Sequence, residues 1–128
     1  MLASFGRKFG LDPEMAFRLS RGLSAGMGFG GICGAVTGSF LVLGLWVGDA
    51  QEEKAARYRT YDLVRDFISR FEQKRGTVQC RELLGGVNLG TPEGRKEAEE
   101  KKLFTQVCPG YVEDAALILE EMMSGRGR

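Results

Sequence analysis

The 128-residue chain contains no histidine. Without an imidazole, neither a Ser–His nor a Cys–His catalytic pair can form, which excludes the common serine and cysteine hydrolases. A His-ligated haem is excluded for the same reason, and the Cys-x-x-Cys-His signal for covalent haem attachment is missing. The chain also has no Cys-x-x-Cys pair, the spacing that thioredoxin-like proteins and zinc ribbons need. Its three thiols are therefore the leading candidates for chemistry.

The chain has almost no net charge. Its 18 Lys and Arg residues stand against 17 Asp and Glu residues, a formal charge of +1, so we expect no nucleic-acid partner. Residues 1–10 lack the apolar stretch of a secretory signal, and we expect a cytoplasmic location. An odd number of cysteines in that reducing setting argues against a disulfide scaffold. The length predicts a single helical domain over residues 1–124, with a flexible basic tail over 125–128.

Sustained apolar–polar alternation is absent, so no sheet is expected. The fold class is predicted to be all-α, a compact bundle of four to five main helices. Asp12 before Pro13, and Thr91 before Pro92, are typical of helix starts because the first side chain caps the helix and proline fits its first position. Helical segments are expected over residues 13–22, 32–46, 50–75 and 81–84, and from residues 92 and 109 onward.

Residues 22–48 contain no charged residue and place glycine at 22, 26, 30, 34 and 38. This length and spacing raise the alternative of a membrane-spanning helix. The glycine-rich half, 22–31, has low helix propensity and predicts a loop. The remaining stretch, 32–46, is too short to span a bilayer and predicts a central, Gly-rich apolar helix, so we expect no membrane insertion. Gly34 and Gly38 would share one face of it, where a neighbouring backbone or a bound group can approach closely.

The three cysteines, Cys33, Cys80 and Cys108, each stand at a predicted helix start. Backbone N–H groups and the helix dipole favour a thiolate there, and thiolates act as nucleophiles, redox groups or metal ligands. The alternative is that each is simply a small buried hydrophobe. Since all three share this position, we interpret them as one reactive or ligating set.

The segment Cys-Gly-Ala-x-x-Gly at residues 33–38 occurs with four other short motifs. These are Gly-Leu-Asp at 10–12, Met-Gly-Phe-Gly-Gly at 27–31, Cys-Arg-Glu-Leu-Leu-Gly at 80–85 and Cys-Pro at 108–109. In this order the chain, from about Leu2 to Met122, resembles a family of small redox-active proteins named for its cysteine pattern, C_GCAxxG_C_C. The family is related to the N-terminal part of split-Soret cytochrome c. Three of its four cysteines match this chain, and the first would stand just upstream of residues 2–5.

The resemblance implies helical structure, a redox or metal-linked role and self-association, and we expect a homodimer with an unknown redox partner. Cys33, Cys80 and Cys108 would act either as ligands of an iron–sulfur or other metal cluster, or in thiol–disulfide exchange. Both alternatives stay open, because the type of ligand does not decide between them. Four glycines would give close backbone access to that site. They are Gly30, Gly31, Gly34 and Gly38.

A second hypothesis is a non-catalytic helical interaction module whose cysteines are structural and buried. It would dimerise through Tyr61, Phe67 and Phe71 or through the last helix. The reactivity of the thiols in the folded protein separates the two hypotheses. The sequence leaves open whether the protein is an enzyme, and it does not identify a substrate or an electron partner.

Overall fold

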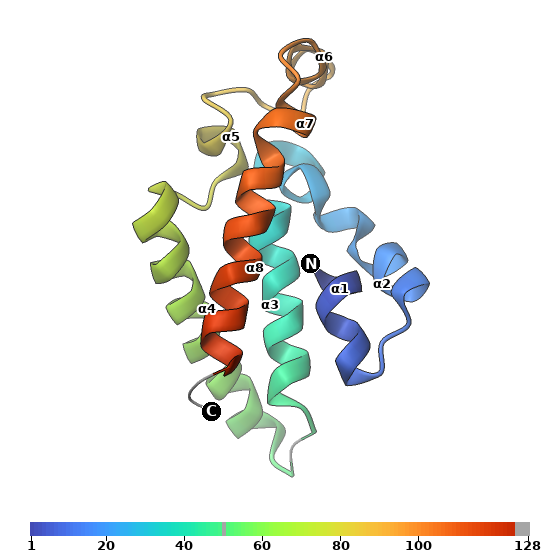
Figure 1. The fold of residues 1–128 in the computed structure, drawn as a ribbon, viewed down its shortest axis with the longest axis vertical. Coiled ribbons are helices and arrows are strands. Elements are labelled where there is room, and N and C mark those ends of the chain that lie inside the picture. The colour runs from blue at the N-terminus through green and yellow to red at the C-terminus, as the bar shows by residue number, and fades with distance from the viewer. Residues whose placement is uncertain (50, 125–128) are drawn as a thin grey trace.

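Helices dominate the chain in Figure 1, a computed structural model that describes residues 1–49 and 51–124. The α-helices are α1 (Leu2–Gly6), α2 (Pro13–Ser20), α3 (Gly34–Val47), α4 (Glu53–Arg75), α5 (Cys80–Leu83), α6 (Pro92–Glu100), α7 (Leu103–Gln106) and α8 (Cys108–Ser124). Shorter helical turns cover Arg7–Phe9, Arg21–Leu23 and Gly26–Gly30. No strand occurs within the described ranges, where the only sheet-like feature is an isolated bridge between Ile32 and Gln79. The prediction of an all-α fold is confirmed.

The two predicted helix caps are present. The side chain of Asp12 accepts a hydrogen bond from the backbone N–H of Met15, 3.1 Å away, and α2 begins at Pro13. The Thr91 hydroxyl accepts from the N–H of Gly94 at 2.9 Å, and α6 begins at the following proline. Each cap satisfies an N–H group that has no partner inside the helix. These short motifs were therefore sufficient to predict where both helices begin.

Helix α3 lies in the middle of the fold, between α1 on one side and α4 and α8 on the other (Figure 1). Its side chains Val36, Val42 and Leu43 are fully buried. The hydroxyl of Ser39, also buried, donates to the carbonyl of Ala35 at 2.7 Å, so its burial leaves no polar group unpaired. The predicted central apolar helix is confirmed. It begins at Gly34, two residues later than expected.

Helix α4 packs one face on this centre. Phe67 and Phe71 have no exposed surface, and the ring of Phe67 meets that of Phe40 edge-on at 6.1 Å. Both phenylalanines therefore belong to the monomer core and are not free to form a dimer contact, which corrects that part of the interaction-module hypothesis. Tyr61 remains 50% exposed.

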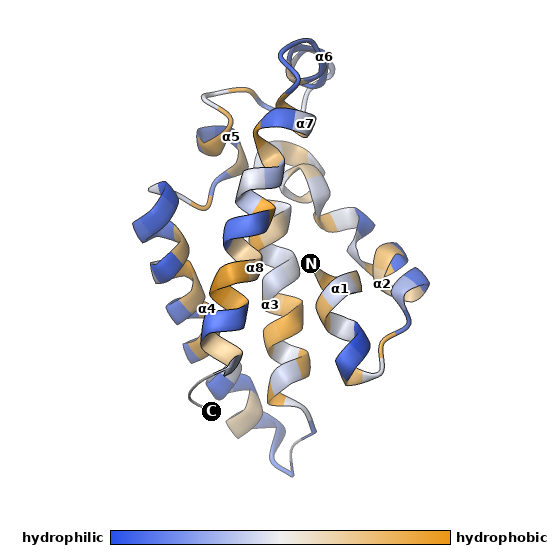
Figure 2. Ribbon diagram, in the orientation of Figure 1, coloured by the Kyte–Doolittle hydropathy of each residue, from blue (hydrophilic) through white to orange (hydrophobic). Residues whose placement is uncertain are grey.

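The hydropathy colouring distinguishes α6 from the central helix (Figure 2). Helix α6, which carries most of the charged run over residues 95–102, is strongly hydrophilic, whereas α3 is white to orange along its length. Among the described residues, no helix has the length and apolar character to cross a membrane. That residues 1–124 form one domain stays a prediction. The expected helix start at Ala50 and the tail over 125–128 lie outside the described residues.

Candidate redox site

A short antiparallel contact between residues 31–33 and 78–80 brings two cysteines together from distant parts of the chain. The backbone N–H of Cys33 donates to a carbonyl of the opposite segment at 2.8 Å, and that of Cys80 donates at 2.6 Å. Helix α3 starts directly after Cys33, and α5 starts at Cys80. Both thiols thus stand at helix starts, as predicted, and the same backbone contact holds the two starts side by side.

The pairing also places these two thiols on one side of the backbone contact. Cys33 and Cys80 are diagonal neighbours across the bridge between Ile32 and Gln79. Both residues line one cavity.

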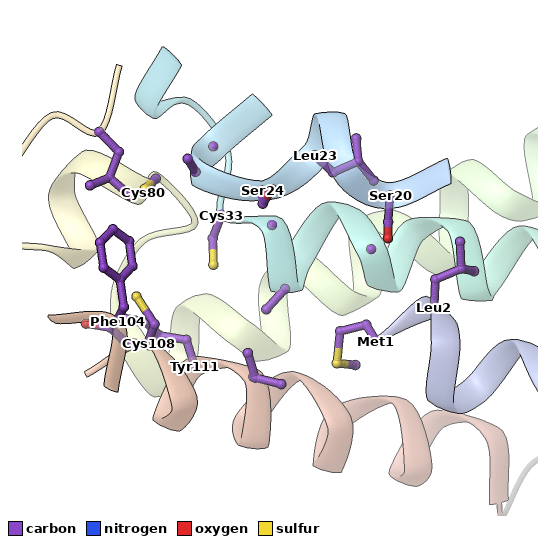
Figure 3. A pocket seen from close by; sticks show the side chains of 17 residues that line it. Met1, Leu2, Ser20, Leu23, Ser24, Cys33, Cys80, Phe104, Cys108 and Tyr111 are labelled. Carbon is purple, nitrogen blue, oxygen red and sulfur yellow. The ribbon is translucent and has the colours of Figure 1, made fainter. Parts of the chain in front are cut away.

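The third cysteine, Cys108, is the first residue of α8 and faces the same space. Figure 3 shows the sulfur atoms of Cys33 and Cys108 pointing into a common cavity. This cavity has a volume of about 500 Å³, and Cys80 also lines it. Most of the other lining residues are apolar, among them Leu23, Leu89, Phe104 and Val112. All three cysteines are free, and all three line this cavity.

The four predicted glycines divide into two pairs. Gly34 and Gly38 line the cysteine cavity. A Cβ on Gly34 would stand 3.0 Å from the carbonyl oxygen of Leu23, so the absence of a side chain there lets another part of the backbone pack against the start of α3. Gly30 and Gly31 instead line a separate, more polar cavity beside Thr77 and Glu82. Whether any of the four contacts a bound group stays a prediction.

A fifth glycine, Gly26, was not among the predicted site residues. It has a φ of +62°, and a Cβ there would lie 2.4 Å from the backbone nitrogen of Gly31 and 2.9 Å from the Cβ of Cys80. Only glycine fits both the backbone conformation and the space. Gly26 belongs to the series of glycines at every fourth residue, and this spacing was the available sequence signal for it. The spacing does not show which glycine contacts a cysteine.

Burial raises the pKa of every thiol in the site. For Cys80 burial is the largest cause, the neighbouring charges of Cys33 and Cys108 add to it, and together they raise the pKa to about 11 against a smaller opposing effect of Arg81. The pKa of Cys33 is raised by burial, partly offset by two backbone N–H groups in the first turn of α3. The pKa of Cys108 is raised by burial and by Cys33. The expectation that helix starts alone favour thiolates is therefore wrong for the free thiols, because burial outweighs the helix ends.

The described residues contain no group of three or more Cys, Asp or Glu side chains placed to hold one metal ion. Ligation of a metal or a cluster by the three cysteines stays a prediction.

The model of one protein family, described as "Putative redox-active protein (C_GCAxxG_C_C)", matches residues 1–122. The chain belongs to this family. No curated protein and no solved structure matches the chain. The matched region spans the central helix, the residues that line the cavity and all three cysteines. Its family description supports a redox role but does not separate cluster ligation from thiol exchange.

Helix α1 also reaches the cavity. Met1 and Leu2 line the cavity as well, toward the end away from the three cysteines (Figure 3). Tyr111 is a further lining residue that was not among the predicted site residues. Its spacing of three from Cys108 places both on one side of α8. That spacing could be read from the sequence, but the segment that Tyr111 contacts elsewhere in the fold could not.

Proposed function

We propose that this protein is an electron-transfer protein in which Cys33, Cys80 and Cys108 bind an iron–sulfur cluster. The observation that carries the proposal is the convergence of three free thiols, from α3, α5 and α8, on one largely apolar cavity of about 500 Å³. A cluster held in this way supplies one-electron transfer.

The ionisation of the thiols argues against a ready nucleophile. Raised pKa values mean that the free cysteines stay protonated at neutral pH, and Cys80 is disfavoured as a thiolate by its two neighbours as well as by burial. A thiol is a weak nucleophile in that form. Metal binding also requires deprotonated thiols, and the positive charge of iron would offset the cost of burial and the repulsion between the thiolates.

The lining of the site supports the same choice. Leu23, Leu89 and Phe104 are apolar, and apolar surroundings influence the potential of a bound cluster. Three thiols leave one position of a four-iron cluster for a ligand from elsewhere.

Iron and sulfide analysis after anaerobic purification tests the proposal, with reconstitution from ferrous iron and sulfide as a second route. We expect matching iron and sulfide contents and visible charge-transfer absorption, lost in Cys33→Ser, Cys80→Ser and Cys108→Ser. Met15→Leu is the control, because it removes an exposed sulfur on α2 that does not line the cavity. Failure of the wild-type protein to bind iron and sulfide by either route would overturn the cluster proposal.

A second candidate is thiol–disulfide exchange between Cys33 and Cys108, favoured by one observation. Their sulfur atoms point into the same space, and each lies at the start of a long helix (Figure 3). Oxidation would join the two sulfurs and pass two electrons to an oxidised disulfide, with loss of two protons. Metal-free protein that loses two titratable thiols on oxidation, with the new bond mapped to Cys33 and Cys108, would favour this function. Three unreactive thiols would favour the interaction module.

Both candidates leave the assembly of the protein to be tested. We propose a homodimer, as the family resemblance implies, that exchanges electrons with a separate protein in the cytoplasm. Phe67 and Phe71 cannot form its interface because they are buried. Sedimentation analysis of the purified protein measures its oligomeric state directly.

A further inference from the structure

A side-chain hydrogen bond links the helix that carries Cys80 to the helix that carries Cys108. The phenolic O–H of Tyr111 on α8 donates to the backbone carbonyl of Leu83, the last residue of α5, at 2.5 Å. The two residues are 28 positions apart, so the bond joins separate parts of the fold. Carbonyls in the last turn of a helix lack a partner within it, which makes this one a ready acceptor.

The position of this bond relates it directly to the thiols. Leu83 follows Cys80 by three residues in the single turn of α5, and Tyr111 follows Cys108 by three residues on α8. Tyr111 also lines the cavity beside both cysteines. Any change in the distance between the two helix turns must change the length of this bond, the separation of the thiols, or both.

The phenol ring is itself fixed from the opposite side. The guanidinium of Arg75, the last residue of α4, lies 4.7 Å from the centre of the Tyr111 ring. Its Nε donates to Asp114 at 2.6 Å, in an ion pair whose side chains are 35% and 18% exposed. A Cβ on Gly110 would come within 3.1 Å of this guanidinium, so the glycine leaves room for Arg75 against α8. Few rotamers of the tyrosine are compatible with both contacts.

We propose that Tyr111 is a positioning residue that sets the separation of the Cys80 and Cys108 thiols through its bond to Leu83, with Arg75 and Asp114 holding its ring. This inference rests on the proposed function in one respect, which is that the cysteines are the reactive or ligating residues. It applies equally to cluster ligands and to an exchanging pair, and its test uses metal-free protein. Absence of iron would therefore overturn the cluster proposal and leave this one unaffected.

The chain allows a direct measurement, because Cys33→Ser leaves only these two thiols. In that background, equilibration with reduced and oxidised glutathione gives the effective concentration of one thiol relative to the other. The reaction converts two thiols and one oxidised glutathione into one protein disulfide and two reduced glutathiones, so electrons and protons balance.

We expect Tyr111→Phe to lower this effective concentration about fivefold, which corresponds to a hydrogen bond worth about 1 kcal/mol. The hydroxyl is the only group removed, and without it the two helix turns spend less time at the separation that the bond maintains. Tyr61→Phe is the matched control, since it removes the same group from an exposed site on α4 and should leave the equilibrium unchanged.

An unchanged or raised effective concentration in Tyr111→Phe would overturn the proposal, even if the variant unfolds at a lower temperature, because loss of stability alone shows a merely structural role. Arg75→Gln provides a second variant in case Tyr111→Phe does not fold. It keeps the hydroxyl but removes the contacts that hold the ring, and we expect a fall of about twofold, the effect of a weak cation–π contact. No change in this variant would show that Arg75 does not hold the ring.

Discussion

The ionisation of Cys80 offers a sharp test of how the fold controls its thiols. Burial and the two neighbouring cysteines raise the pKa of this thiol to about 11. At pH 8, a rise of about two units reduces the thiolate fraction roughly a hundredfold. Each thiolate becomes intrinsically more nucleophilic as its pKa rises, by roughly six- to tenfold over two units. Alkylation of Cys80 should therefore be at least about tenfold slower than in the unfolded chain.

The assay is the rate of alkylation by iodoacetamide between pH 6 and 12 in metal-free protein, with the modified Cys80 peptide quantified by mass spectrometry. The same chain in urea supplies the ordinary thiol pKa. The variant Cys33→Ser/Cys108→Ser separates the causes, because it removes both neighbouring thiols and leaves burial. We expect its midpoint to lie between the value in urea and that of the wild-type protein, since burial is the largest cause.

Arg81 has the opposite effect on the same thiol. Its positive charge lowers the pKa of Cys80, so Arg81→Gln should raise the midpoint further. A midpoint at or below the value in urea, in either the wild-type protein or the double variant, would refute the reasoning. It would show that backbone N–H groups at the start of α5 outweigh burial.

Three further predictions concern stability and are measured by urea unfolding. Gly26→Ala should lower the free energy of unfolding by about 2–4 kcal/mol, because the new methyl group would collide with Gly31 and Cys80. Gly28→Ala has open space around it and should lower the free energy of unfolding by only about 1–2 kcal/mol, because of its positive φ. Equal losses in the two variants would exclude the steric cause. Ala25→Gly should raise the free energy of unfolding by about 0.5–1 kcal/mol, since alanine has a φ of +58° there, and a loss would show that its methyl group packs usefully against the cavity. Phe67→Ala should cost about 3–5 kcal/mol, against less than about 1 kcal/mol for the exposed Tyr61→Ala, and similar values for the two would contradict the core described for α4.

Local chemistry in the sequence was enough to predict the start of two helices and the character of a third. Asp12 and Thr91 cap the helices that follow them because the capping bond forms within three residues. The apolar stretch before Trp46 forms a buried central helix because it has no polar face to expose. Helix starts at all three cysteines also followed from nearby glycine and proline. These features depend on residues that are close together in the chain, so they can be predicted from the sequence.

Other features depended on which segments meet. The bridge that sets Cys33 beside Cys80 joins residues 47 positions apart, and no local pattern indicates that pairing. The same contact places Gly26 against Cys80, and leaves Gly30 in a different cavity. A positive φ or a short glycine period shows that a glycine is needed, but not what it faces.

The sequence by itself determined an all-α chain with three thiols at helix starts and no imidazole to assist them. Only the tertiary structure decided that the thiols share one cavity, that burial raises their pKa values, and that Tyr111 links two of their helices. The physical reason is one of range. Capping and helix periodicity act over a few residues, whereas desolvation and the repulsion between thiolates depend on everything that the fold packs around them.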